Sequence, residues 1–190
     1  MASWDQVKWT EARQVADLMK LDPSFLEDQK ADPETGYRTL RSLGEIGAAV
    51  RFLGYALPRF EAVSWAAHLL QDWSRSATLG VSERQALDCV QRWLEEPSEE
   101  YRRAAYEAGE KVTSNSPERL LTDAVFMSGG SISEPDLPPV QPPQHVCGAL
   151  AASAVLASAY VTADPKAALT AACDAGEKVA ASGAKALATK

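Results

Sequence analysis

Apolar side chains recur every three or four residues along most of this chain, which is the spacing of one face of an α-helix. The pattern is clearest after Glu45, where the apolar positions are Ile46, Ala49, Val50, Leu53 and Leu57. Pro58 follows, and proline fits the first turn of a helix but not its interior. We therefore expect two helices to meet at Pro58, the second starting at Arg59 and turning Trp65 toward the core.

A nine-residue sequence occurs twice. AAYEAGEKV at residues 104–112 returns as AACDAGEKV at residues 171–179. Each copy follows a helical pattern and a turn that contains an acid and a proline, Glu96-Pro97 in the first case and Asp164-Pro165 in the second. Short connections of this kind place consecutive helices antiparallel to each other. The repeat therefore predicts two helical hairpins with related packing.

Gly109 and Gly176 occupy the same position in the two copies. A glycine inside a helix lowers its stability by about 1 kcal/mol relative to alanine. Two glycines at the same position of a repeat therefore need a physical explanation. We expect both to lie within helices, where the missing side chain lets a neighbouring helix approach closely. The alternative is a cradle for a ligand, although no phosphate-binding glycine pattern surrounds either residue.

Residues 129–144 form a proline-rich segment, called the strap below. Gly129 and Gly130 are expected to end the preceding helix by supplying left-handed backbone. Five prolines within the strap then exclude helix and favour an extended chain. A free linker gains nothing from apolar anchors, so Ile132, Leu137 and Val140 predict a strap that lies on the helices.

Together these elements predict an all-α fold, a compact bundle of about eight to ten helices in one domain, residues 1–190. Its expected parts are a less regular N-terminal part (1–44), a first helical unit (45–128), the strap (129–144) and a second, shorter unit (145–190). Composition supports this fold class, because alanine is used heavily while valine, isoleucine and threonine are sparse.

Charge narrows the range of partners. The net charge is −7, from 19 lysines and arginines against 26 acids, and most of the negative charge lies before residue 140. Nucleic acid is not expected as a partner, since its phosphates require a concentrated positive surface. A partner chosen by charge would instead meet the N-terminal part with a basic surface. The longest uncharged stretch, residues 146–161, is too short for a membrane span.

The three cysteines and two histidines suggest no reactive or metal site. The cysteines are odd in number and lack CxxC spacing, so we expect neither a disulfide framework, a zinc site nor another cofactor, and a reducing cytoplasm fits best. His145 and Cys147 are two residues apart and would point to different sides of a helix, which argues against a catalytic pair. His68 is the remaining histidine, and it lies between apolar positions. The chain is therefore not expected to be an enzyme.

Several other residues are candidates for structural or partner contacts. Arg51 lies within a strongly apolar helix and is expected to pair with an acid such as Glu61 at the edge of the core, a ligand contact being the alternative. Aromatic residues near a chain end and exposed acids are common at protein interfaces. The candidate partner contacts are Trp4, Trp9, Asp28, Asp32, Glu34, Ile132 and Leu137.

Residues 49–65, AVRFLGYALPRFEAVSW, resemble the core of an uncharacterised family of bacterial all-helical proteins, AVRFLA-ALPxREAVWW. RRAA after the first acid-proline turn, SGGS at residues 128–131 and the strap extend the resemblance over most of the chain. Phe60 and Ser64 stand where that family commonly has arginine and tryptophan. The resemblance implies an association with type VI secretion components and brings no enzymatic activity with it.

These observations favour a cytoplasmic, non-enzymatic protein-binding adaptor or chaperone, accessory to the loading of a type VI secretion effector or spike. An immunity protein that covers a basic toxin cleft is the alternative within the same class. A secreted effector or enzyme of unrecognised activity, and a small-molecule binder, are alternatives from other classes. The expected partner is another protein, and a homo-oligomer is left open.

Overall fold

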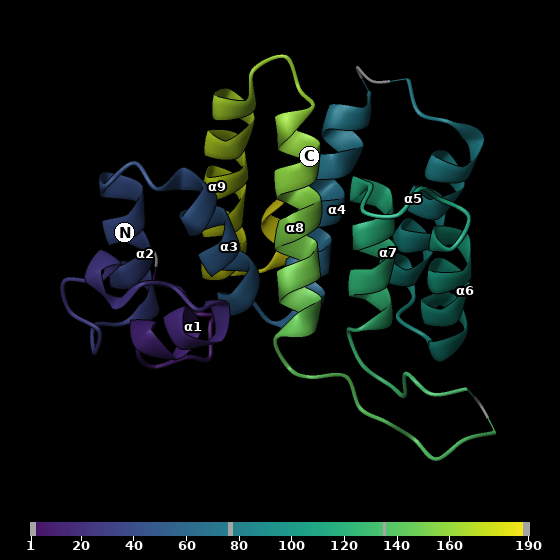
Figure 1. Cartoon of the computed structure of the whole chain (residues 1–190), viewed down its shortest axis with the longest axis horizontal. Helices are drawn as coiled ribbons and strands as arrows, with labels where there is room; N and C mark the ends of the chain where they lie inside the picture. The colour runs from purple at the N-terminus through teal and green to yellow at the C-terminus, as the bar shows by residue number, and fades with distance from the viewer. Residues whose placement is uncertain (1–2, 76–77, 135, 188–190) are drawn as a thin grey trace.

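The computed structural model describes residues 3–75, 78–134 and 136–187, and within them the chain is helical, with no strand (Figure 1). The all-α prediction is confirmed, and the helix number within these residues, nine, lies in the expected range. The helices are α1 (Ala12–Met19), α2 (Pro33–Ser42), α3 (Ile46–Ala56), α4 (Arg59–Ser74), α5 (Val81–Glu95), α6 (Glu99–Gly109), α7 (Pro117–Phe126), α8 (Val146–Tyr160) and α9 (Pro165–Ser182). Short 3-10 turns occupy Pro23–Phe25 and Ala184–Leu187.

The helices are arranged side by side along the long axis of the molecule (Figure 1). α1 and α2 lie at one extreme, α3, α9, α8 and α4 form the middle, and α7, α5 and α6 lie at the other extreme. Most consecutive helices run antiparallel, so their connections gather at two opposite edges. We call the edge that carries the strap, the α3–α4 turn and the start of α8 the strap end. Within the described residues, no helix is long and apolar enough to cross a membrane.

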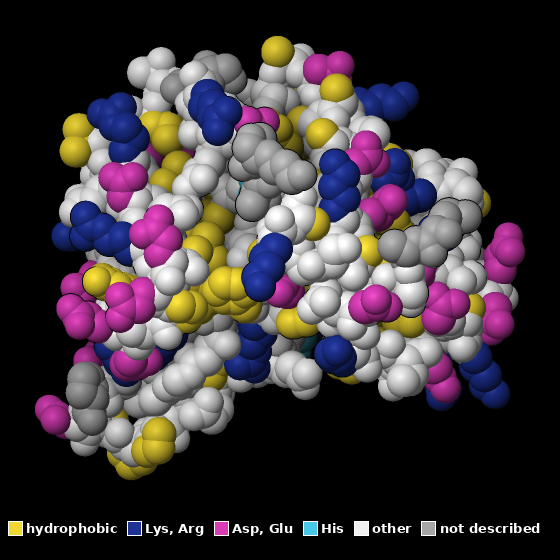
Figure 2. Space-filling model, turned by 180° about the vertical axis from the view of Figure 1, so that it is seen from behind, with side chains coloured by type: hydrophobic (Ala, Val, Ile, Leu, Met, Phe, Trp, Pro, Cys, Tyr) yellow, Lys and Arg dark blue, Asp and Glu magenta, His cyan; other side chains and the backbone are white. Residues whose placement is uncertain are grey.

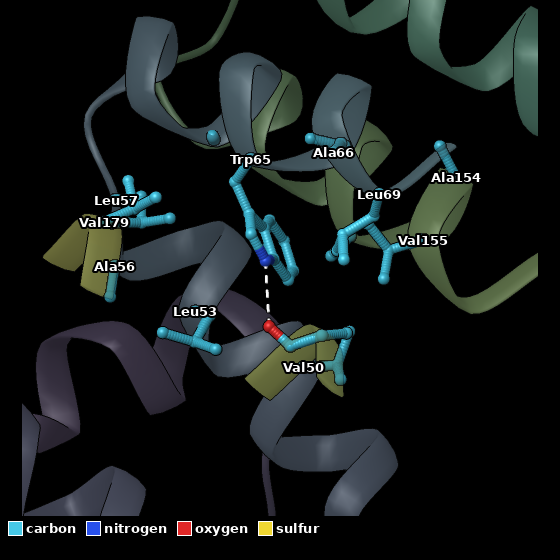
Figure 3. Packing of buried hydrophobic residues seen from close by; sticks show 14 of the residues in the cluster. Val50, Leu53, Ala56, Leu57, Trp65, Ala66, Leu69, Ala154, Val155 and Val179 are labelled. Atoms are coloured by element: carbon cyan, nitrogen blue, oxygen red, sulfur yellow. Dashed lines mark hydrogen bonds between the residues drawn. The ribbon is translucent and has the colours of Figure 1, made fainter. Parts of the chain in front are cut away.

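One cluster of buried side chains draws on all nine of these helices. Trp65 lies fully buried near its middle, among Leu53 of α3 and Val155 of α8 (Figure 3). Its indole Nε1 donates a hydrogen bond to the Ala172 carbonyl of α9 at 2.9 Å. A buried indole usually needs such a partner, and this bond fixes α4 against α9.

α3 and α8 cross at two glycines, and this contact was not predicted. A Cβ atom built on Gly148 would lie 1.9 Å from the Gly54 carbonyl oxygen, and one on Gly54 would lie 2.5 Å from the Gly148 carbonyl oxygen. Backbone therefore touches backbone, which only residues without a side chain permit. α3 ends at Ala56 and Pro58 directly precedes α4, so the two helices meet there.

Both predicted hairpins are present, as α5–α6 and α8–α9. Gly176 lies inside α9, and a Cβ atom there would come within 2.5 Å of Leu53 Cδ1 on α3. Gly109 belongs to α6 but is its last residue, so the expectation that it lies in the middle of a helix is wrong. A Cβ atom on Gly109 would lie 2.0 Å from Thr122 Oγ1 on α7. Both glycines lie at close helix contacts, but the neighbouring helices differ.

Candidate functional site

The strap projects from the bundle instead of lying on it (Figure 1). Leu137 is 59% exposed and Val140 is 50% exposed, so the expectation that they anchor the strap on the helices is wrong. Apolar side chains gather at its tip, at the lower left of Figure 2. Of the three predicted anchors, only Ile132 is half-buried, and its backbone N–H donates to the Val140 carbonyl at 2.9 Å. The strap folds back on itself because its two limbs bond to each other at the neck.

Three arginines hold the neck of the strap. Arg102 Nη2 donates to the Ser131 carbonyl at 2.7 Å, and Arg103 Nη2 donates to the Ser131 and Ser133 carbonyls at 3.2 and 3.0 Å. Arg59 donates to three further carbonyls, those of Ser128, Pro142 and Gln144, at 3.3 to 3.4 Å. Proline has no N–H, so a proline-rich segment cannot pair all of its own carbonyls. Guanidinium groups, with five donors each, supply the missing bonds.

Arg102 is the buried member of this group, and its charge is compensated locally. Its guanidinium bonds both carboxylate oxygens of Glu99 at 2.7 and 2.8 Å and lies 4.6 Å from the centre of the Phe126 ring. The Arg102 hydrogen bond lowers the pKa of the Glu99 carboxyl below its ordinary value. Such a charge pair with a stacked ring makes the neck a rigid support.

Of the two glycines that begin the strap, only Gly130 has left-handed backbone, with φ of 63°. A Cβ atom on Gly130 would lie 2.7 Å from Glu99 Oε2. Gly129 has no positive φ and open space around it, so the left-handed role expected of it is wrong. The reason is that α7 has already ended at Phe126, three residues earlier.

A cleft of about 600 Å³ opens beside Arg59 at the strap end. Its walls come from three parts of the chain: Lys8 and Trp9, the α3–α4 turn with Tyr55, and the start of α8 with His145. Trp9 Nε1 donates to the Tyr55 carbonyl at 3.1 Å. The Tyr55 and His145 rings stack with their centres 6.2 Å apart and their planes 9° apart. We call this hollow the strap-end cleft.

The strap-end cleft is cationic although the chain is acidic. Among the described residues that line it, none is an aspartate or glutamate. Lys8 and Arg59 form no ion pair with any described residue. α4 and α8 also begin here without a side-chain cap, so the positive ends of two helix dipoles add to the field. The cleft therefore favours an anionic group flanked by an apolar or flat one.

His145 and Cys147 do not form a catalytic pair. Cys147 is buried, and its thiol donates to the Arg59 carbonyl at 3.7 Å. Burial raises the pKa of the Cys147 thiol to about 12, with the Arg59 charge opposing only part of that rise. The thiol is neutral and inaccessible at neutral pH, which is the opposite of what a nucleophile requires. In the described part of the chain, no three His, Cys, Asp or Glu side chains gather as a metal ion would require.

Trp4 and Trp9, the aromatic partner contacts proposed from the sequence, have different surroundings. Trp4 is only 8% exposed and its ring lies 5.0 Å from that of Tyr37, so its expected exposure is wrong. The Gln6 backbone N–H donates to the Ala180 carbonyl at 3.0 Å, which keeps this end of the chain from fraying. Trp9 is half-buried in the cleft wall. Of the two, Trp9 is the more exposed.

The acidic run near the N-terminus contributes to local structure. Asp32 caps α2 by accepting from the Thr35 N–H and hydroxyl at 3.0 and 2.7 Å, and Glu34 pairs with Arg38. Asp28 accepts from the Lys30 N–H at 2.9 Å. These bonds are typical of turns and helix starts. They explain why acids occur there without requiring a basic partner.

Arg51 and Glu61 do not pair, contrary to expectation. Arg51 is exposed and donates to the Met19 carbonyl at 2.7 Å, at the end of α1. The last carbonyls of a helix lack partners within it, and Arg51 supplies one. Glu61 accepts from the Ala184 N–H, in the turn that follows α9. Each side chain is used to attach a terminal segment to the bundle.

A network between α2 and α9 was missed from the sequence. Tyr37 donates its hydroxyl hydrogen to Glu177 at 2.9 Å, and Arg41 bonds both Glu177 and Asp174 at 3.0 and 3.2 Å. Burial raises the pKa of the Tyr37 phenol well above its ordinary value. The available signal was helical spacing, since Tyr37 and Arg41 are four residues apart and Asp174 and Glu177 are three apart.

Comparisons with known proteins give one match. No curated protein and no solved structure matches the chain. The family of unknown function DUF6931 matches residues 36–180, about three quarters of the chain. That range contains the three arginines and the strap, whereas Lys8 and Trp9 of the cleft lie before it. The chain belongs to the family of unknown function DUF6931.

Proposed function

We propose that the protein is a non-enzymatic adaptor or chaperone that binds another protein with its strap end. One observation carries the proposal: Arg59, Arg102 and Arg103 fix the neck of the strap, while the side chains of Leu137 at its tip and Val140 beside the neck are left in solvent. Exposed apolar groups add nothing to the stability of this fold. A tip fixed in advance loses little entropy when a partner covers it, which increases affinity.

Proline-rich segments bind other proteins by a known physical route. An extended, proline-rich chain is already ordered before binding, and it docks in grooves lined by aromatic side chains. The strap has this composition and places it away from the bundle. The neutral, buried Cys147 supports the non-enzymatic part of the proposal. The resemblance of the sequence adds a type VI secretion setting, with an effector or spike component as the partner.

The test replaces the exposed tip. Leu137→Ser combined with Val140→Ser removes the two exposed apolar side chains and leaves the arginine contacts and the backbone bonds of the neck in place. Val161→Ser is the matched control, because Val161 is 81% exposed at the opposite edge. Affinity purification with crosslinking in native cells should recover the same partner with the wild type and the control, and lose it with the tip variant. Equal recovery with the tip variant, at unchanged melting temperature, would refute the proposal.

A second candidate is an immunity protein, favoured by the acids at the α5–α6 turn. Glu95, Glu96 and Glu100 are exposed there, and Glu99 shares a surface hollow with the strap. An acidic edge beside an apolar tip could cover a basic toxin cleft. Reversing Glu95, Glu96 and Glu100 to lysine should then abolish protection of a strain that expresses the neighbouring toxin. An adaptor would leave that strain unprotected with either version.

A further inference from the structure

We infer that the strap-end cleft is a receptor for an acidic, proline-flanked segment, and that its occupant is the strap of a second copy of this chain. The inference rests on the proposed function only in that both require an accessible strap tip. The proposed function gives the cleft no role, and the present inference assigns a binding partner to it.

The cleft carries unbalanced positive charge. The Arg59 guanidinium donates hydrogen bonds to backbone carbonyl groups. Carbonyl groups are uncharged, so these bonds do not neutralise its positive charge. Among the described residues, Lys8 donates to the Asp5 carbonyl, at 3.3 Å, and to no carboxylate. No described residue that lines the cleft carries a carboxylate. A carboxylate from another molecule would therefore meet two cations there, Lys8 and Arg59. Elsewhere in the described chain, Arg41, Arg102, Arg103 and Arg119 each have an acid within reach.

The strap tip carries the complementary charge. Glu134 and Asp136 are exposed, and neither forms an ion pair with a described residue. Leu137 and the two prolines after it follow directly in the sequence. One molecule thus presents two unpaired carboxylates beside an apolar, proline-rich chain, and also a cationic cleft of a size that suits such a segment.

The shape of the cleft wall also fits proline. Trp9 and Tyr55 present aromatic surface, and His145 stacks on Tyr55 and extends it. Aromatic walls are what extended proline segments recognise. A cleft built only for a small anion would not need three rings.

A strap does not fill the cleft of its own molecule. Glu134, Leu137 and Pro139 share a hollow with Glu99 and Arg103 of α6, so the tip leans toward α6. Lys8 and Trp9, which also line the cleft, precede α1 in the chain, whereas the strap extends toward the end of the molecule that carries α5 and α6, away from α1 (Figure 1). The occupant must therefore come from another molecule.

A second copy provides that occupant in a closed arrangement. The α3–α4 turn and the start of α8, which line the cleft, lie at the same end of the molecule as the strap (Figure 1). Two copies that meet end to end can therefore each insert a strap into the cleft of the other. Such a two-fold exchange is self-complementary and stops at the dimer. It also covers both strap tips, so the dimer and the adaptor would compete for the same surface.

Charge exchange between two variants tests this arrangement. Lys8→Glu removes the net positive charge of the cleft and places a carboxylate opposite the acidic strap, while Glu134→Lys with Asp136→Lys makes the strap basic and leaves the cleft cationic. Each variant alone should dimerise at least about tenfold more weakly than the wild type in sedimentation equilibrium, since each now opposes like charges. An equimolar mixture restores both contacts and should form a heterodimer. Lys166→Glu, the same charge change at the opposite edge, should dimerise like the wild type.

A strap peptide separates this inference from the proposed function. A synthetic peptide of residues 131–144 should change the tryptophan fluorescence of the full chain, and Lys8→Glu should abolish that change. A wild type that stays monomeric across the dilution series would overturn the second copy as occupant, even if the peptide binds. Failure of the peptide to bind would overturn the cleft as a receptor. Neither result affects recovery of a tip-dependent partner, on which the proposed function depends.

Discussion

The two AGEKV copies have nearly the same sequence but pack against different neighbours. In the first, Gly109 ends α6 and meets Thr122 of α7, while in the second Gly176 lies inside α9 and meets Leu53 of α3. The second hairpin also touches α3 through Gly148, which meets Gly54, the residue after Leu53. The second hairpin therefore encloses α3 from two sides, whereas the first packs at the outer side of the bundle.

The comparison shows which properties such a repeat encodes. In both copies the glutamate of AGEKV reaches an arginine of a neighbouring helix, Glu110 to Arg119 at 3.1 Å and Glu177 to Arg41 at 3.0 Å. The glycine thus allows a close approach to the neighbouring helix, and the glutamate forms an ion pair beside that contact. The neighbour itself is determined by the rest of the chain. The motif is a packing device in both places.

The largest effect should come from Gly148, the glycine that joins the second hairpin to α3. Gly148→Ala would press a methyl group against the Gly54 carbonyl, and backbone cannot move aside as a side chain can. We expect the free energy of unfolding to fall by about 3 kcal/mol in urea titrations. Gly47→Ala is the control, since Gly47 lies in α3 with open space around it and should gain stability or stay unchanged. If Gly148→Ala destabilised the protein no more than Gly47→Ala does, the close crossing of α3 and α8 would be contradicted.

Gly109→Ala should come second and test the first hairpin. Thr122 Oγ1 and Cβ would lie 2.0 and 2.9 Å from the new methyl group, and Thr122 is fully buried, so part of α7 must shift. The expected loss is about 2 kcal/mol. Adding Thr122→Ala removes the nearer obstacle, so the double variant should lose less than the sum of the two single variants. Simple additivity would show that Thr122 is not what limits the approach of α6.

Gly176→Ala should cost least of the three glycines. Its obstacle is the end of the Leu53 side chain, 2.5 Å away, which has more freedom than backbone or a threonine Cβ. Alanine inside α9 also recovers about 1 kcal/mol of helix propensity, which Gly109 at the end of α6 recovers less fully. We expect a net loss of about 1 kcal/mol or less. A larger loss than that of Gly109→Ala would reverse the comparison of the two copies.

The sequence predicted local features of the fold better than it predicted pairings across the chain. Helical periodicity and Pro58 placed α3 and α4, because both act within a few residues. The expected Arg51–Glu61 pair and the burial of Leu137 were wrong, because each depends on which surface a residue meets after folding. The Gly54–Gly148 crossing was missed for the same reason. Nothing near either glycine in the sequence indicates the other.

The candidate site was predicted less well than the fold. Trp9 was singled out, but its value as a contact comes from Tyr55 and His145, which lie far from it in sequence. The three arginines at the strap neck were missed because they bind backbone carbonyls, and carbonyls carry no sequence signal. A partial signal was available: a proline-rich segment must have unpaired carbonyls, so donors should have been sought nearby.

The smallest expected effect is a pH-dependent contribution of Glu99 to stability, which the first hairpin has and the second lacks. The returning helix of the first hairpin begins with Glu99, bonded to Arg102 and Arg103, whereas that of the second begins with Pro165 and Lys166. The pKa of Glu99 is lowered in the folded state by its bond to Arg102, so the carboxylate adds stability above its unfolded-state pKa of 4.5. That stability is lost as the pH falls through the lower folded-state value.

Glu99→Gln should therefore reduce stability at neutral pH by about 0.5 kcal/mol or less, because Glu99 is 52% exposed and solvent screens the pair. The difference between the wild type and this variant should shrink as the pH falls below 4.5. Glu107→Gln, an exposed change on the same helix, is the control. Urea titrations at several pH values measure both. A difference that persists in acid would mean that Glu99 stabilises the first hairpin by packing. The proposed electrostatic difference between the two hairpins would then be wrong.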